Sequence, residues 1–201
     1  FKARRRAESP KITGTIHGTV DASGPGIYAE LDDQGRYKVR FPFDLNQSHG
    51  PGKASWFVRM MQPYGGSNHG FHFPLHKGTE IILSFLDGNP DRPVIAGAIP
   101  NPDTISPVIG PIQTTARITT LGQNKIHMED LAGNQRIYIY SPTEDSWIRL
   151  GYPNYPPLQD SGSGIRVRTD ANLWLEADDS YGDYVVGVPD AGPSGIQDLL
   201  D

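Results

Sequence analysis

The 201-residue sequence contains no cysteine, which excludes disulfide bonds and thiolate metal sites. It also lacks any long apolar run, so a membrane-spanning helix is excluded. Basic residues are in the minority, with 18 Lys and Arg against 23 Asp and Glu and a net charge of -5. Because phosphate binding needs clustered Lys and Arg, this balance argues against a surface dedicated to nucleic acid. Because disulfide bonds and thiolate metal sites are excluded, stability must come from packing or from assembly.

Glycine and proline are abundant, with 23 and 18 residues. Both interrupt long helices, so the composition favours short strands joined by turns. The chain begins at Phe1 and shows no apolar signal-peptide core. We therefore expect an all-β protein, and the start fits a fragment of a longer chain.

Alternation of apolar and polar residues predicts half-buried strands across residues 12–98. A turn at residues 32–35 predicts a hairpin between residues 27–30 and 37–43, and residues 46–55 read as a loop. The apolar row of the second hairpin strand should point inward, because burial of one aromatic outweighs an exposed charge. That row is Tyr37, Val39, Phe41 and Phe43.

Residues 56–61 carry large side chains on both faces, which predicts a strand that is covered on both sides. We expect Trp56 and Phe41 to anchor the core. Residues 79–85 and 93–98, joined by a turn at 87–92, complete about five strands. This number within a hundred residues predicts a small closed barrel.

Prolines without periodicity mark a boundary near residues 101–111, and the strands beyond it carry only two or three apolar residues on one face. Such strands cannot offset the backbone ordering of roughly 1 to 2 kcal/mol per residue alone, so neighbouring chains should complete the burial. The expected strands are 124–130, 136–140, 165–169 and 172–177, with an insertion at 151–164. The division that we expect is an N-terminal linker 1–11, a barrel 12–101, a Pro-rich linker 102–114, a needle segment 115–188 and a flexible tail 189–201.

The sequence pattern of the first strands is distinctive, and it extends from residue 33 to residue 101. It resembles the OB-type barrel of the central spike in contractile injection machines, the VgrG proteins of type VI secretion and the related phage tail spikes. A looser match continues through residues 124–139. The residues that fall on the family's pattern are Asp33, Gly35, Arg36, Lys38, Val39, Phe41, Asp44, Trp56, Gly78, Glu80, Asp87, Gly88, Pro90, Asp91, Arg92 and Pro93.

This resemblance implies a structural, membrane-puncturing part: a homotrimer whose OB-type barrels lead into an intertwined β-helix or β-prism needle. Its implied partners are tube, sheath or baseplate proteins at the barrel end, a tip protein or effectors at the needle end, and transiently the target membrane. Such a part is assembled in the bacterial cytoplasm, or on a phage virion, and delivered outside. The chain departs from the family in lacking the N-terminal half before the barrel and in carrying the insertion at 151–164, and its valine-glycine repeats are thin.

Two sequence motifs resemble metal-binding sites but lack part of the required pattern. His69, His72 and His76 could converge on zinc, but no carboxylate completes the pattern and Pro74 prevents a helix that would align the imidazoles. The run 87–91 starts like a calcium loop but has Arg92 where glycine is required, so we expect a turn in which Asp91 pairs with Arg92 or Arg36.

Hydrolase chemistry has equally weak support. Ser194 misses the Gly-x-Ser-x-Gly spacing by one residue. A carboxylate pair among Glu129, Asp130, Glu144 and Asp145 would need an inserted domain for which the chain has no room. We therefore assign no catalytic, cofactor-binding or metal-binding residue and expect no enzyme.

Two other functions stay open. A barrel of this type could bind single-stranded nucleic acid through aromatics beside basic residues, here Tyr37, Phe41, Trp56 and Arg59. A hidden cell-wall hydrolase site is the other alternative. The needle is expected to stop near Val188, with the acidic end at residues 198–201 covered by another subunit or continued by further chain.

Overall fold

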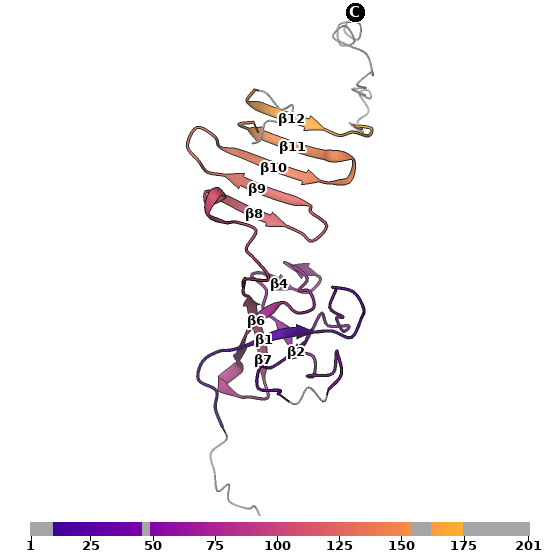
Figure 1. Ribbon diagram of the computed structural model, residues 1–201, viewed down its shortest axis with the longest axis vertical. Coiled ribbons are helices and arrows are strands. Elements are labelled where there is room, and N and C mark those ends of the chain that lie inside the picture. Colours follow the sequence, from indigo (N-terminus) through magenta and orange to yellow (C-terminus); the bar gives the residue numbers. More distant parts are fainter. Residues whose placement is uncertain (1–9, 46–48, 154–161, 175–201) are drawn as a thin grey trace, which may run out of the picture. The chain divides into compact units, whose positions relative to one another are not determined.

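A computed structural model describes residues 10–45, 49–153 and 162–174. The described residues form strands and short 3-10 turns, and none of them lies in an α-helix (Figure 1). The chain divides into two compact units, residues 1–106 and 107–201. Among the described residues, no helix has the length and hydrophobicity needed to cross a membrane. The expectation of an all-β fold is confirmed.

The first unit is built around a five-stranded sheet with the order β2-β1-β6-β7-β3. Its strands are β1 (Ile16–Asp21), β2 (Lys38–Arg40), β3 (Arg59–Met60), β6 (Glu80–Phe85) and β7 (Pro93–Ala98). All neighbours in the sheet are antiparallel except β3 and β7, which run parallel. The strands predicted at 79–85 and 93–98 are therefore present.

The two edges of this sheet meet. Tyr37, just before β2, and Val58, just before β3, form an antiparallel bridge in which each backbone N–H donates to the other's carbonyl, at 2.9 and 2.6 Å. Pairing of the first edge strand with the last turns the sheet into a closed ring, as a five-stranded barrel requires. The core within it consists of Val20, Tyr37, Val39, Val58, Ile81, Leu83, Phe85 and Ile95.

The predicted aromatic row is only half correct. Tyr37 and Val39 are fully buried and Phe41 packs against the core, but Phe43 is 66% exposed because β2 ends at Arg40 and the chain turns there. The prediction that Trp56 anchors the core is wrong, because its side chain is 91% exposed. Residues 54–57 are not a strand, so the alternation that would have turned Trp56 inward does not extend to it.

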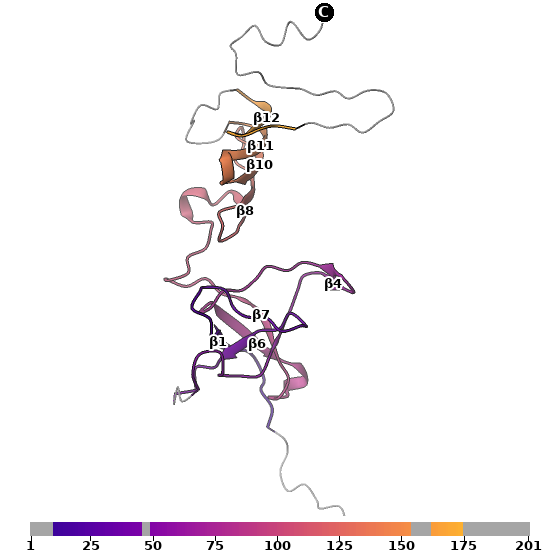
Figure 2. The same ribbon diagram turned by 90° about the vertical axis from the view of Figure 1, so that its right-hand side faces the viewer.

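The predicted hairpin between residues 27–30 and 37–43 is also wrong, although its turn is present. The N–H of Gly35 donates to the Asp32 carbonyl at 2.9 Å, and Gly35 adopts a φ of 69°. However, β2 pairs with β1, and Tyr28 instead bridges to His76. The sequence between β1 and β2 is thus a long loop. A short hairpin, formed by β4 (Gly65–Gly66) and β5 (His69–Gly70), projects from the barrel in Figure 2.

The second unit is an antiparallel meander in which the five strands follow one another in chain order. They are β8 (Thr115–Thr119), β9 (Lys125–Glu129), β10 (Arg136–Ser141), β11 (Ser146–Gly151) and β12 (Gly164–Arg168). The strands predicted at 124–130, 136–140 and 165–169 are confirmed, whereas β8 and β11 were missed. The strand predicted at 172–177 is absent over residues 172–174, and the rest of it lies outside the described residues.

Candidate functional site

One face of the meander carries a regular apolar pattern. Side chains alternate along each strand, and the strand register places apolar residues opposite apolar residues across all five strands. Two columns result. One column is Ala116, Met128, Ile137, Leu150 and Ile165, and the other is Ile118, Ile126, Ile139, Ile148 and Val167.

This apolar face, defined by those ten residues, is open in the single chain. Its large side chains are between 38% exposed, at Leu150, and 78% exposed, at Ile165. Scattered exposed apolar residues are ordinary, but a continuous apolar area that spans a whole sheet marks an interaction surface. Fully burying one such side chain contributes about 1.5 to 3 kcal/mol, so covering the exposed part of all ten would contribute on the order of 10 kcal/mol per chain.

The opposite face of the meander is covered by its own long side chains. Lys125 lies over the Tyr140 ring at 5.0 Å, and Arg166 lies over the Trp147 ring at 5.6 Å. Tyr138 packs against both Tyr140 and Trp147, with ring centroids 5.8 and 5.9 Å apart. These aromatic and cationic contacts run from strand to strand. They hold this face together within one chain, unlike the apolar face.

Two titratable groups lie on this second face. Burial, followed by the nearby Arg136 and Arg117 charges, lowers the pKa of His127 to about 4. The Glu129 carboxylate accepts a hydrogen bond from the Thr114 hydroxyl, which is the largest cause lowering its pKa to about 2. Further hydrogen bonds from the Leu131 N–H and the Thr115 hydroxyl act in the same direction. His127 is therefore neutral and Glu129 ionised at neutral pH. Glu129 ties the loop before β8 to the end of β9.

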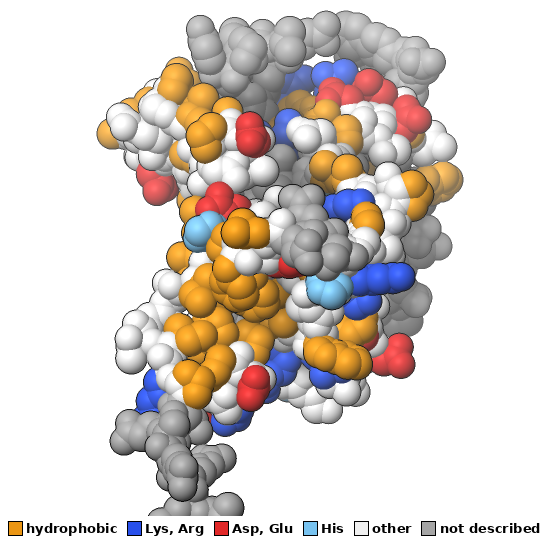
Figure 3. All heavy atoms as spheres, turned by 60° about the horizontal axis from the view of Figure 1, so that its bottom comes forward, with side chains coloured by type: hydrophobic (Ala, Val, Ile, Leu, Met, Phe, Trp, Pro, Cys, Tyr) orange, Lys and Arg blue, Asp and Glu red, His pale blue; other side chains and the backbone are white. Residues whose placement is uncertain are grey.

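The barrel also exposes apolar side chains. Phe41 stacks on Phe43 at 5.1 Å, and Leu45 is 87% exposed beside a hollow that Phe41, Pro42 and His17 line. The space-filling view shows hydrophobic side chains gathered in a continuous area with charged side chains along its edge (Figure 3).

The three histidines of the zinc hypothesis each have a different neighbour. His69 packs on Tyr64, the His72 ring nitrogen lies 3.3 Å from the Gln62 amide, and His76 meets the edge of Tyr28. Within the described part of the chain, no group of three or more His, Asp or Glu side chains is placed to hold a metal ion.

The calcium-like run is a turn. The Leu86 N–H donates to the Arg92 carbonyl, and the Asp91 N–H donates to the Asn89 side chain. The expected pairing of Asp91 with Arg92 or Arg36 is wrong. Arg92 pairs with Asp87 at 3.1 Å, and Arg36 pairs with Asp32 at 2.7 Å.

Two of the four candidate carboxylates make hydrogen bonds or ion pairs that hold the local structure. Glu129 accepts the hydroxyl bonds described above, and Asp145 pairs with Arg168 at 3.3 Å. Asp130 and Glu144 are exposed in turns. Ser194 and the predicted tail lie outside the described residues.

Comparison with known proteins finds a family model that matches the barrel region and several spike proteins to which the chain is similar. Residues 26–99 match the family model of the type VI secretion system/phage-baseplate injector OB domain. The chain is 32% identical over 153 residues to the type VI secretion system spike protein VgrG3 of Vibrio cholerae, and 34% identical over 119 residues to the spike protein VgrG1a of Pseudomonas aeruginosa. It is also 32% identical over 139 residues to the actin cross-linking toxin VgrG1 of Vibrio cholerae.

The alignment to VgrG3 covers 73% of this chain but 15% of that relative. The alignment to VgrG1a covers 55% of this chain and 18% of the relative, and the alignment to the toxin VgrG1 covers 66% of this chain and 12% of the relative. The chain thus spans less than a fifth of the length of these relatives. The part that matches the family model includes β2, β3, β6 and β7, with the parallel β3–β7 pair, and begins after β1. This chain belongs to the VgrG-type family of spike proteins, and residues 26–99 are its injector OB domain.

Proposed function

We propose that this chain is a structural segment of the membrane-puncturing spike of a contractile injection apparatus, in which three copies combine their meanders into one needle. The open apolar face of the meander is the observation that carries the proposal. Its ten side chains form two unbroken columns, so identical copies can cover one another's faces along the whole sheet. The polar and aromatic face would then point outward.

Delivery and partners follow from this assembly. The spike is assembled inside the producing cell or on a phage virion, meets baseplate or tube proteins at the barrel end, and carries a tip protein or effectors at the needle end. It is then translocated toward a target cell. Support comes from the spike proteins to which the chain is similar. We propose no enzymatic activity for this segment.

Replacement of Ile139 by Lys in the full spike tests the function. Ile139 lies at the centre of the apolar face, so a buried charge there should prevent assembly of the needle. We expect the apparatus to stop releasing both the spike and its tube protein into the medium. The control is Gln135→Lys, which adds the same charge at an exposed turn position. Normal release by the Ile139→Lys variant would contradict the proposal.

A further inference from the structure

A hollow in the barrel wall is not used by the proposed needle. It measures about 590 Å³ and lies between residues 54–59, which lead into β3, and the turn at residues 90–93, which leads into β7. Arg36 and Phe41 complete its wall. In OB-type barrels, oligonucleotides and oligosaccharides bind on the face of the second and third strands between two loops. The size falls within the range of sites that hold small ligands or a few peptide residues.

An exposed indole stands in this hollow. Trp56 is 91% exposed, although a large apolar side chain gains about 1.5 to 3 kcal/mol when it is buried. Its backbone is held in place, because the Ser55 hydroxyl donates to the Trp56 carbonyl at 2.6 Å and accepts the Val39 N–H at 2.9 Å. Tryptophan and arginine are among the residue types that are enriched at the positions contributing most to protein–protein affinity.

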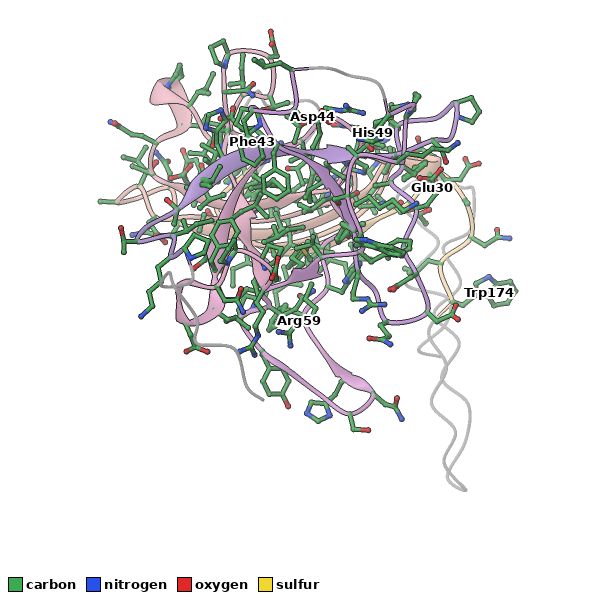
Figure 4. The ribbon with its side chains drawn as sticks, turned by 90° about the horizontal axis from the view of Figure 1, so that it is seen from below. Glu30, Phe43, Asp44, His49, Arg59 and Trp174 are labelled. Atoms are coloured by element: carbon green, nitrogen blue, oxygen red, sulfur yellow. The ribbon has the colours of Figure 1, made fainter. Side chains whose placement is uncertain are left out.

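The charges of the hollow are unequal. Three arginines line it, and Asp91 is the one carboxylate among its lining residues. Arg36 and Arg92 are already paired, with Asp32 and Asp87. The Arg59 side chain has no hydrogen bond or ion pair with another described residue, and it points outward on the side of the barrel away from Phe43 and Asp44 (Figure 4).

We propose that this hollow binds an acidic segment of a partner protein in which a carboxylate side chain lies next to an apolar one. The carboxylate pairs with the guanidinium of Arg59, which can bind it in a bidentate manner. The apolar neighbour packs on Trp56 and Phe57. A strand of phosphates fits less well, because it carries a charge on every residue, whereas Arg59 is the one lining arginine without a carboxylate partner among the described residues, so the hollow matches a single carboxylate better.

The test uses a fluorescein-labelled hexapeptide with two glutamates that flank a leucine and a phenylalanine, and fluorescence anisotropy as the readout. We expect saturable binding to the purified chain. Arg59→Gln and Trp56→Ala should each weaken it at least about tenfold. Lys53→Gln is the control, because it removes one exposed positive charge from the same barrel outside the hollow. Circular dichroism checks that all variants keep the fold.

Four results would overturn the proposal. The first is no saturable binding at millimolar peptide. The second is equal weakening by Lys53→Gln, which would indicate a general charge effect. The third is a labelled oligothymidine that binds more tightly than the peptide and loses its affinity in Arg59→Gln, which would make the hollow a nucleic-acid site. If Trp56→Ala instead dissociates copies of the chain from one another, the hollow is a contact between copies and the proposal fails.

Discussion

Tyr37 and Val58 exchange two backbone hydrogen bonds across residues that are far apart in the sequence, and this exchange closes the barrel. The Tyr37 hydroxyl also accepts the Leu75 N–H at 3.0 Å. One buried tyrosine thus joins the start of β2, the approach to β3 and the loop that precedes β6.

Replacement of Tyr37 by Phe should destabilise the barrel by about 1 to 2 kcal/mol, because the Leu75 N–H loses its acceptor while the ring stays in the core. Chemical denaturation of the barrel measures the change. In hydrogen exchange, the amides of Tyr37 and Val58 should be protected like those of the strands. Exchange of these two amides at the rate of an unstructured peptide would show that the barrel is open.

Trp56→Ala should change the free energy of unfolding by less than about 0.5 kcal/mol, because the indole is exposed. Ile95→Ala is the contrasting variant, since Ile95 is fully buried and its truncation should cost about 2 to 5 kcal/mol. Urea denaturation of both variants compares them. If Trp56→Ala lost several kcal/mol of unfolding free energy, Trp56 would have to be packed in the core, and the basis of the proposed hollow site would be removed.

His127 should make the meander less stable as the pH falls from about 6.5 to about 4. Its pKa is lowered in the folded state, first by burial and then by Arg136 and Arg117, so the unfolded chain binds a proton more readily across this interval. The stability that neutral His127 permits is present above pH 6.5 and is lost as the pH falls through about 4. Thermal unfolding of the wild type and of His127→Gln between pH 4 and 7.5 measures this. An equal pH dependence in both proteins would contradict it.

Glu129 acts at lower pH. Its pKa of about 2 in the fold, set first by the Thr114 hydroxyl, lies below the usual 4.5, so its contribution is present above pH 4.5 and disappears as the pH falls through about 2. Glu129→Gln should therefore be less stable than the wild type at pH 6, and the difference should shrink toward pH 2. A difference that does not change with pH would show that the hydrogen bonds do not depend on the charge.

The barrel strands could be predicted where alternation and turn residues coincide, as they do on both sides of the turn at 87–92. The position of Trp56 could not, because its exposure depends on where a strand begins, and alternation alone does not mark that point. The partner of β2 was also misassigned, since a nearby turn suggested a local hairpin and the actual partner, β1, lies across a long loop.

In the meander, the sequence predicted the need for burial but not all of the strands. Its sparse apolar pattern indicated that burial had to come from elsewhere, but β8 and β11 were missed, although each carries two residues of the apolar face like the three strands that were predicted. The alternation in Thr115–Thr119 and Ser146–Gly151 was the available signal. Only the register, in which Ile118 meets Ile126 and Ile148 meets Ile139, shows that the residues form continuous columns.

The molar mass of the purified chain in solution tests the central claim most directly. Light scattering coupled to size exclusion should give about three times the 22.0 kDa of one chain, because the apolar face has to be covered by other copies. Ile139→Lys should lower the mass, while Gln135→Lys should leave it unchanged. A wild-type chain that stays a folded 22.0 kDa monomer at micromolar concentration would contradict the needle assembly.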